Sequence, residues 1–172
     1  PSYVGFLFTE EVFHLSKAFN PPKPFLFLLA GDKFQTKLPL VRKFLKIADQ
    51  VFIGGALAND LLKAGGHEIG ISKHSESNID FGEILNSPKL ILPSDVVTEN
   101  AGKTAVKNLN DVLPSDAIFD AGPNTVSVLA EQIASAKFVL WNGTLGVYEK
   151  GFKEGTHALA KVLAAGDVES IV

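Results

Sequence analysis

Two lysines, Lys33 and Lys37, follow a short apolar run that ends at Gly31, an arrangement suited to holding an anion. The run from Phe25 to Ala30 is typical of a strand covered on both faces in a parallel sheet. The lysines are spaced as neighbours on one helix face, and the glycine lets a ligand approach free backbone N–H groups. The stretch is not a P-loop, because no second glycine precedes a lysine. The alternative is a solvated helix start with two exposed lysines.

Four predicted strands end in a glycine-containing junction. These junctions are Ala30-Gly31, Gly54-Gly55, Ala121-Gly122 and Asn142-Gly143. In a parallel α/β sheet the carboxyl ends of the strands share one edge, where ligands bind and helix N-termini add partial positive charge. With the two lysines, the junctions predict a site for a phosphate-bearing ligand. The alternative is that the glycines only begin tight turns from strand to helix.

Three acidic residues fall near this predicted edge. Asp32 complicates the anion site, because its carboxylate would repel phosphate unless it points away or binds a metal. Asp120 or Glu149 could accept hydrogen bonds from ribose hydroxyls, although capping or solvated acids are the commoner outcome. We interpret Trp141 as a core residue rather than a stacking platform.

Composition narrows the function classes. The 172 residues carry a net charge of −3, which argues against a nucleic-acid-binding surface. The absence of cysteine excludes disulfides and thiolate metal sites and agrees with a cytoplasmic origin. The four histidines lack the short paired spacings of a zinc site, and no apolar run approaches membrane-spanning length. The sequence has no methionine and no signal-peptide pattern, so we expect a fragment or a processed chain.

Hydrophobic periodicity predicts alternating strands and helices in one domain over residues 1–172. Expected helices cover about 9–19, with Thr9 as N-cap, and 36–47, 56–64, 123–136 and 155–165, with one turn near 81–85. Expected strands cover about 25–30, 49–55, 89–92, 116–120, 137–141 and 169–172, with a weaker pair at 95–98 and 104–106. This order favours an α/β fold, a parallel sheet with helices on both faces.

At its junctions the chain resembles the phosphoglycerate kinase family, specifically the C-terminal, nucleotide-binding domain. Ala30-Gly-Asp-Lys-Phe-Gln-Thr-Lys37 is similar to the family's Gly-Gly-Ala-Lys-x-x-x-Lys, and Ile53-Gly-Gly-Ala56 to its triple glycine. Asp120-Ala-Gly-Pro-Asn-Thr125 is similar to Asp-x-Gly-Pro-x-Thr. Trp141-Asn-Gly-Thr-Leu-Gly-Val-Tyr-Glu149 is similar to Trp-Asn-Gly-Pro-x-Gly-Val-Phe-Glu. The departures are Ala30, Asp32, Ala56 and Thr144, and Asp32 adds negative charge beside the expected phosphate path.

The resemblance implies an α/β fold with a three-layer Rossmann-like, six-stranded parallel sheet. It also implies phosphoryl transfer between 1,3-bisphosphoglycerate and Mg-ADP, giving 3-phosphoglycerate and Mg-ATP in glycolysis. It implies that Lys33 and Lys37 contact the nucleotide phosphates and the transferring group, that Asn142 contacts phosphate, and that Glu149 binds ribose. Gly31, Gly54, Gly55, Phe119 and Val147 match positions around the adenine. Gly122 and Gly143, at the other two junctions, complete the expected ATP/ADP-binding set.

The resemblance also implies parts beyond this sequence. The family's Gly-Gly-Gly-Asp-Thr motif, whose acid holds the magnesium, would follow Val172, so we expect no metal ligand within the chain. An N-terminal domain would bind 3-phosphoglycerate. We expect a monomeric chain that is inactive alone. The alternatives are a stand-alone or degenerate nucleotide-binding module without catalysis, and an interaction domain in which Asp32 has abolished binding.

Overall fold

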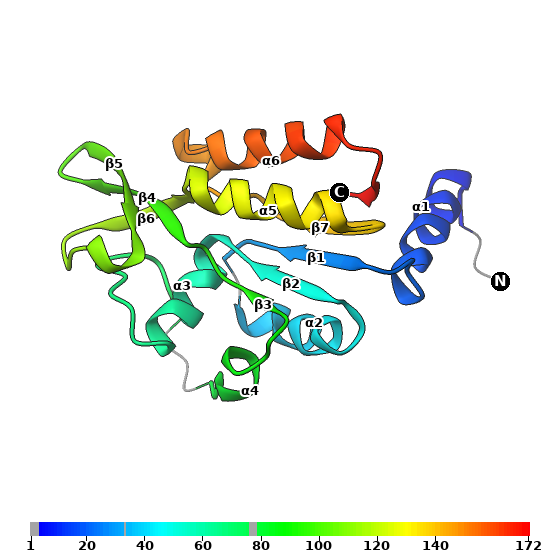
Figure 1. Ribbon diagram of the computed structural model, residues 1–172, viewed down its shortest axis with the longest axis horizontal. Helices are drawn as coiled ribbons and strands as arrows, with labels where there is room; N and C mark the ends of the chain where they lie inside the picture. The colour runs from blue at the N-terminus through cyan, green and yellow to red at the C-terminus, as the bar shows by residue number, and fades with distance from the viewer. Residues whose placement is uncertain (1–3, 33, 76–78) are drawn as a thin grey trace.

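The computed structural model describes residues 4–32, 34–75 and 79–172, and its centre is a five-stranded parallel sheet. The strands are β1 (Phe25–Leu29), β2 (Gln50–Ile53), β3 (Leu90–Ile91), β7 (Phe138–Asn142) and β8 (Glu169–Ile171). Their order is β3-β2-β1-β7-β8, and every neighbouring pair is parallel (Figure 1). The predicted α/β class and parallel sheet are confirmed.

Strand β1 is buried on both faces, as its unbroken apolar sequence predicts. Phe25, Phe27 and Leu29 belong to one hydrophobic cluster, whereas Leu26 and Leu28 belong to another. This alternation follows from the two-residue period of side chains along a strand. The two clusters therefore lie on opposite faces of the sheet.

Helices cover both faces of the parallel sheet (Figure 1). One face carries α2 (Phe34–Ile47), whose Val41 and Phe44 pack in the cluster of Phe25 and Phe27. The other carries α5 (Pro123–Ser135) and α6 (Glu154–Ala165), which supply Leu129 and Leu159 among others to the second cluster. Helices α3 (Gly55–Ala64) and α4 (Gly82–Leu85) complete the set near their predicted positions.

Three strands form a separate antiparallel sheet, which the sequence did not predict. Its order is β5-β4-β6, with β4 at Asp95–Asn100, β5 at Lys103–Asn108 and β6 at Ala117–Ala121. The weak pair at 95–98 and 104–106 is confirmed as the β4–β5 hairpin. The placement of the strand at 116–120 in the parallel sheet was wrong, because β6 pairs antiparallel with β4. The parallel sheet accordingly has five strands among the described residues, not six.

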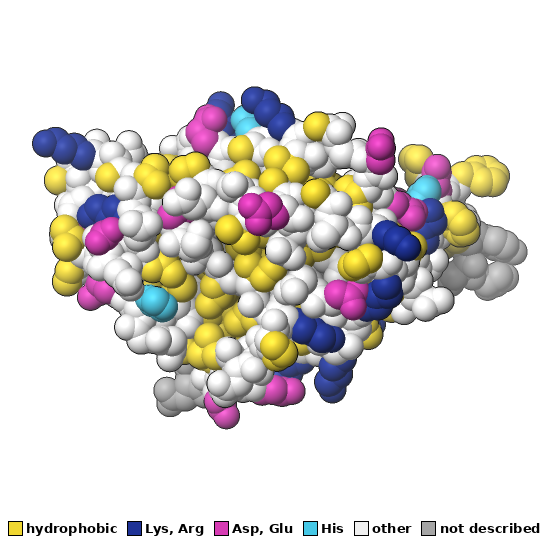
Figure 2. Space-filling model, in the orientation of Figure 1, with side chains coloured by type: hydrophobic (Ala, Val, Ile, Leu, Met, Phe, Trp, Pro, Cys, Tyr) yellow, Lys and Arg dark blue, Asp and Glu magenta, His cyan; other side chains and the backbone are white. Residues whose placement is uncertain are grey.

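Helix α1 (Phe6–Ser16) projects from one end of the molecule and is followed by the short helix η1 (Lys17–Phe19). Its N-cap is Gly5 rather than the predicted Thr9, whose hydroxyl donates back to Gly5 O at 3.1 Å. None of the residues in α1 is buried, and Figure 2 shows hydrophobic side chains exposed at this end. Among the described residues, none of the helices combines the length and hydrophobicity required to cross a bilayer.

Candidate functional site

A cleft of about 700 Å³ lies between the antiparallel sheet on one side and, on the other, the residues that follow β1 together with helix α3. Gly31 and Asp32, just after β1, and helix α3 form the wall on the side of the parallel sheet, and the antiparallel sheet contributes β4 and β6. The remaining walls are the segment 71–73 and the loop 144–150, which contains the short helix η3 (Tyr148–Lys150). This volume is in the range of small-molecule sites.

Five of the predicted site residues meet in this cleft: Gly31, Gly55, Phe119, Val147 and Glu149. They come from positions up to 118 residues apart in sequence (149 − 31) and from four segments of the fold. Asp32 and Asp120, the acids predicted near the ligand, also line the cleft. The fold therefore brings together in one cleft residues that belong to separate motifs of the sequence.

The loop wall of the cleft is fixed to β6 by backbone and aromatic contacts. Val147 N donates to Phe119 O at 2.9 Å. The Phe119 ring stacks on Phe152 at a centroid distance of 4.6 Å, and the Lys150 ammonium lies 4.7 Å from the Phe119 centroid. These contacts hold the predicted nucleoside-side residues of β6 and the loop in one rigid arrangement.

Lys37 lies beside the cleft with its ammonium over the end of β1. Its Nζ donates to Ala30 O at 2.7 Å and to Asn142 Oδ1 at 3.2 Å. A Cβ at Gly31, whose φ is +125°, would lie 2.8 Å from this Nζ, so a larger residue there would force Lys37 aside. Burial lowers the pKa of Lys37, and the nearby Asp32 carboxylate opposes that shift. The other predicted lysine, Lys33, lies outside the described residues.

At two junctions, glycine permits close approach of one backbone segment to another. Gly143 has a φ of +92°, and a Cβ there would lie 2.4 Å from Ala30 O. Gly55 has a φ of +61°, and a Cβ there would lie 2.9 Å from Gly31 N. The tight-turn explanation therefore applies to both glycines, although Gly55 also lines the cleft. Gly54 is buried, and its added Cβ would meet the Phe52 ring at 2.7 Å.

The junction at Gly122 does not lie on the edge of the parallel sheet, so that inference was wrong. Gly122 precedes α5 and packs on Asp95, whose Cγ would lie 2.3 Å from an added Cβ. The Asp95 carboxylate accepts hydrogen bonds from Asn124 N at 3.0 Å and Thr125 N at 2.7 Å. A side-chain carboxylate thus takes the position at the α5 N-terminus where an anion is favoured. The prediction of ligand contact at Gly122 has no support from the cleft.

Asp120 and Trp141 are both buried, with different roles. The Asp120 carboxylate accepts from Ala121 N at 2.8 Å and Gly155 N at 3.0 Å, and burial raises its pKa. Each carboxylate oxygen of Asp120 thus already accepts a backbone hydrogen bond, whereas the prediction that Asp120 could bind ribose required these oxygens as acceptors for the ribose hydroxyls. Trp141 is 5% exposed and its Nε1 donates to Gly143 O at 2.7 Å, which confirms its interpretation as core.

Lys73 also lines the cleft, although no motif in the sequence predicts it there. Its segment is irregular and polar, with no helical or strand periodicity. Lys73 Nζ lies 2.7 Å from Asp32 Oδ2 in an ion pair between exposed side chains. Asp32, which replaces an alanine of the family motif, thus pairs its negative charge with a lysine that lies outside all of the motifs.

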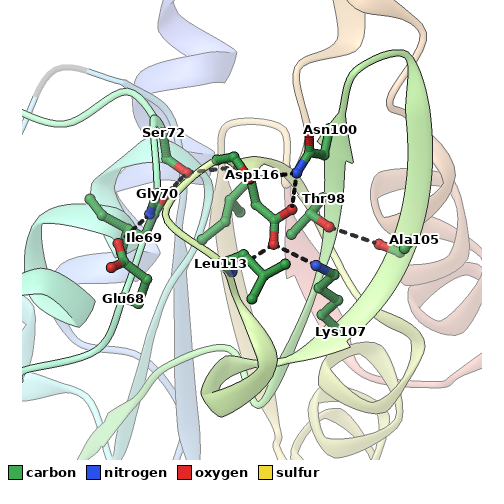
Figure 3. Close-up of polar contacts among 12 residues, drawn as sticks. Glu68, Ile69, Gly70, Ser72, Thr98, Asn100, Ala105, Lys107, Leu113 and Asp116 are labelled. Atoms are coloured by element: carbon green, nitrogen blue, oxygen red, sulfur yellow. Dashed lines mark hydrogen bonds and ion pairs between the residues drawn. The ribbon is translucent and has the colours of Figure 1, made fainter.

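Asp116, whose carboxylate is buried, anchors this segment through its backbone carbonyl (Figure 3). It accepts from Lys107 Nζ at 2.6 Å and Leu113 N at 2.7 Å, and these bonds hold its pKa below the ordinary value. Its own carbonyl accepts from Ile71 N at 2.8 Å. Ser72 Oγ accepts from Ile118 N at 2.8 Å. Segment 70–73 is therefore tied to β6 along one wall of the cleft.

The described residues contain no group of three or more His, Cys, Asp or Glu side chains arranged to hold a metal ion. The three acids of the cleft, Asp32, Asp120 and Glu149, do not form such a cluster.

Comparison with known proteins identifies the family. The phosphoglycerate kinase family model matches residues 1–172. The chain belongs to the phosphoglycerate kinase family. It is 37% identical to the phosphoglycerate kinase of Coxiella burnetii (strain RSA 493 / Nine Mile phase I) over 185 residues, covering 98% of this chain and 46% of that protein. It is 38% identical to that of Staphylococcus aureus (strain JH9) over 175 residues, covering 93% and 43%.

Solved phosphoglycerate kinase structures share this fold. The Coxiella burnetii structure superposes with a TM-score of 0.88 at 37% identity and covers 98% of this chain and 46% of that one. The Pyrococcus horikoshii OT3 structure gives 0.84 at 28% identity, covering 95% and 45%. The chain thus spans less than half the length of the phosphoglycerate kinases it matches.

Proposed function

We propose that this chain is the nucleotide-binding, C-terminal-type domain of a phosphoglycerate kinase and binds ADP or ATP in the cleft between the two sheets. The observation that carries this proposal is the convergence of Gly31, Gly55, Phe119, Val147 and Glu149 on one cleft. The activity of the complete enzyme would be phosphoryl transfer from 1,3-bisphosphoglycerate to ADP in glycolysis.

The phosphates would lie just beyond Gly31, toward the Lys37 ammonium, so that Gly31 would border both the adenine and the phosphates. The Lys37 ammonium lies there, and Asn142 is hydrogen-bonded to it. Lysine acts on phosphate as a point charge, and phosphoryl transfer depends mainly on positioning and charge stabilisation. Lys37 is thus suited to neutralise charge on the transferring group, and we assign the same role to Lys33.

The nucleoside would lie between the start of α3 and the wall formed by Phe119, Val147 and Glu149. Phe119 and Val147 offer apolar surface to a base, and the Glu149 side chain is exposed at the rim. A carboxylate accepts hydrogen bonds from both hydroxyls of a ribose. We assign that role to Glu149 rather than to Asp120, whose carboxylate is bonded to Ala121 N and Gly155 N.

Magnesium would supply charge neutralisation on the β- and γ-phosphates when it arrives with the nucleotide. The described residues do not form a site for it, so no step is assigned to a protein-bound metal. We also expect this chain alone to show no turnover with 3-phosphoglycerate and ATP. It spans less than half of its relatives, and holding both reactants contributes roughly 7–11 kcal/mol to such reactions.

Calorimetric titration of the chain with ADP, with and without Mg²⁺, tests the proposal. We expect saturable weak binding of ADP and no binding of adenosine at the same concentrations, because the charged phosphate end supplies much of the affinity. Absence of ADP binding at millimolar concentration would overturn the proposed function. A coupled kinase assay on the same sample should give only the protein-free rate.

A further inference from the structure

Asp32 and Lys73 face each other across the cleft and form an ion pair. Asp32 follows the end of β1, on the wall of the parallel sheet, and Lys73 lies beside β6, on the opposite wall. The Lys73 Nζ to Asp32 Oδ2 distance is 2.7 Å, and the two side chains are 68% and 50% exposed. The pair therefore bridges the cleft where solvent can reach it.

The backbone of Lys73 is held in place while its ammonium end is free to exchange partners. Asn59, which is buried in α3, donates from Nδ2 to Lys73 O at 2.9 Å. On the N-terminal side of Lys73, Ser72 Oγ accepts a hydrogen bond from Ile118 N of β6, and Ile71 N donates one to the Asp116 carbonyl oxygen. A flexible four-carbon stem then carries the ammonium from this fixed base into the cleft.

We propose that Lys73 is a further contact for the phosphates of the nucleotide, and that Asp32 is an internal competitor that occupies Lys73 when the cleft is empty. This inference rests on the proposed function. A phosphate group carries more negative charge than one carboxylate and offers several acceptor oxygens, so it can displace Asp32 from the ammonium. An exposed ion pair is weak, so its exchange for a phosphate contact is feasible.

The neighbouring charges favour this exchange. The Lys37 ammonium lies over Gly31, the residue before Asp32, and is attracted electrostatically by the Asp32 carboxylate. A carboxylate released from Lys73 therefore remains near a second cation. Lys150 and Glu149 line the cleft on the loop wall, and Asp120 is bonded to backbone donors.

A double-mutant cycle of D32N, K73Q and the double variant tests the proposal, with ADP and inorganic tripolyphosphate titrated at low and high salt. D32N should tighten binding by about two- to fivefold, because it frees the ammonium without changing side-chain shape. K73Q should weaken binding by roughly tenfold. In the K73Q background, D32N should have little effect. E169Q, which removes the acid of the remote Lys17–Glu169 pair, is the matched control and should match the wild type.

The outcomes separate this inference from the proposed function. If K73Q leaves the affinity unchanged, or if D32N tightens binding equally with and without Lys73, the inference is wrong even though the cleft binds nucleotide. If the wild type binds no ADP, but D32N strengthens tripolyphosphate binding only when Lys73 is present, the proposed nucleotide function fails, whereas the exchange of Asp32 for phosphate at Lys73 holds. If neither probe binds any variant, both fail.

Discussion

The Lys37 ammonium lies 3.2 Å from the Asn142 Oδ1 and 2.7 Å from the Ala30 carbonyl oxygen, so one cation joins helix α2 to the ends of β1 and β7. Both strands end at this edge because they run parallel, with Leu29 opposite Asn142. The two side chains are 105 residues apart in sequence. Their contact places a partly desolvated positive charge next to the cleft at Gly31.

The K37A variant should bind ADP about tenfold or more weakly than the wild type. A charge-assisted contact to phosphate is worth roughly 1.5–3 kcal/mol, and the ammonium is already held at the strand ends. Calorimetric titration measures the effect. K46A removes an exposed lysine from the last turn of the same helix and should leave the affinity unchanged. Equal ADP affinities for K37A and the wild type would refute the phosphate-side assignment.

The E149A variant should lose the preference for a ribose with free hydroxyls. The wild type should bind ADP about tenfold more tightly than 2′,3′-dideoxy-ADP, because a carboxylate acceptor makes charged hydrogen bonds worth roughly 1.5–3 kcal/mol. In E149A the two ligands should bind equally. E131A, which removes an exposed acid of α5, should keep the wild-type preference. A preference that persists in E149A would assign ribose recognition elsewhere.

The G143A variant should be destabilised more than G66A, although both glycines have left-handed backbone. Their φ values are +92° and +87°, but an added Cβ meets Ala30 O at 2.4 Å only at Gly143, and nothing within 4 Å at Gly66. G66A should cost about 1–2 kcal/mol for conformation, and overpacking should add roughly 1–3 kcal/mol in G143A. Urea unfolding of both variants gives the comparison. Equal losses would show that the strand ends relax around the new methyl group.

The D116N variant should lower the free energy of unfolding by roughly 2–4 kcal/mol at pH 7, because it leaves the Lys107 ammonium without its buried partner. The Asp116 pKa is held below its ordinary value of 3.8, chiefly by Lys107 and then by Leu113 N. Its stabilisation is therefore present above pH 3.8 and is lost as the pH falls through the lower folded pKa.

Urea unfolding between pH 7 and pH 2 checks this pH dependence. The difference in the free energy of unfolding between wild type and D116N should narrow as the solution is acidified below about pH 4. D49N is a second test of the same relation: the pKa of the half-exposed Asp49 is also lowered, mainly by Phe25 N, so the stability difference between wild type and D49N should narrow on acidification too. If the difference in the free energy of unfolding between wild type and D116N stays constant with pH, Asp116 acts through packing alone.

Sequence reasoning found what depends on local pattern. The run Phe25–Leu29 is apolar on both faces, so its burial between helix layers follows from the residues themselves. The glycine-containing strand ends predicted Gly31 and Gly55 near the ligand edge, because backbone that must bend sharply or approach closely restricts the residue type, whereas Val147 came from the family resemblance; all three line the cleft. Trp141 was likewise placed correctly in the core.

What sequence reasoning missed depends on tertiary partners. The short apolar run at Ala117–Ala121 suits either kind of sheet, and only its pairing with β4 decides between them. The sequence predicted ligand contact at Gly122, whereas in the structure Asp95 of β4 packs on this glycine. Lys73 lies in a segment with no periodicity, so its contact with Asp32 follows only from the bonds that tie residues 70–73 to β6.

Chemical-shift mapping of the ¹⁵N-labelled chain during titration with ADP tests most directly whether the cleft between the two sheets binds the nucleotide. We predict that the largest, saturable changes occur at the amides of Gly31, Gly55, Phe119 and Val147, with small changes in α1 and in the β4–β5 turn. Saturable changes confined to α1 or to that turn, with the cleft amides unmoved, would contradict the account.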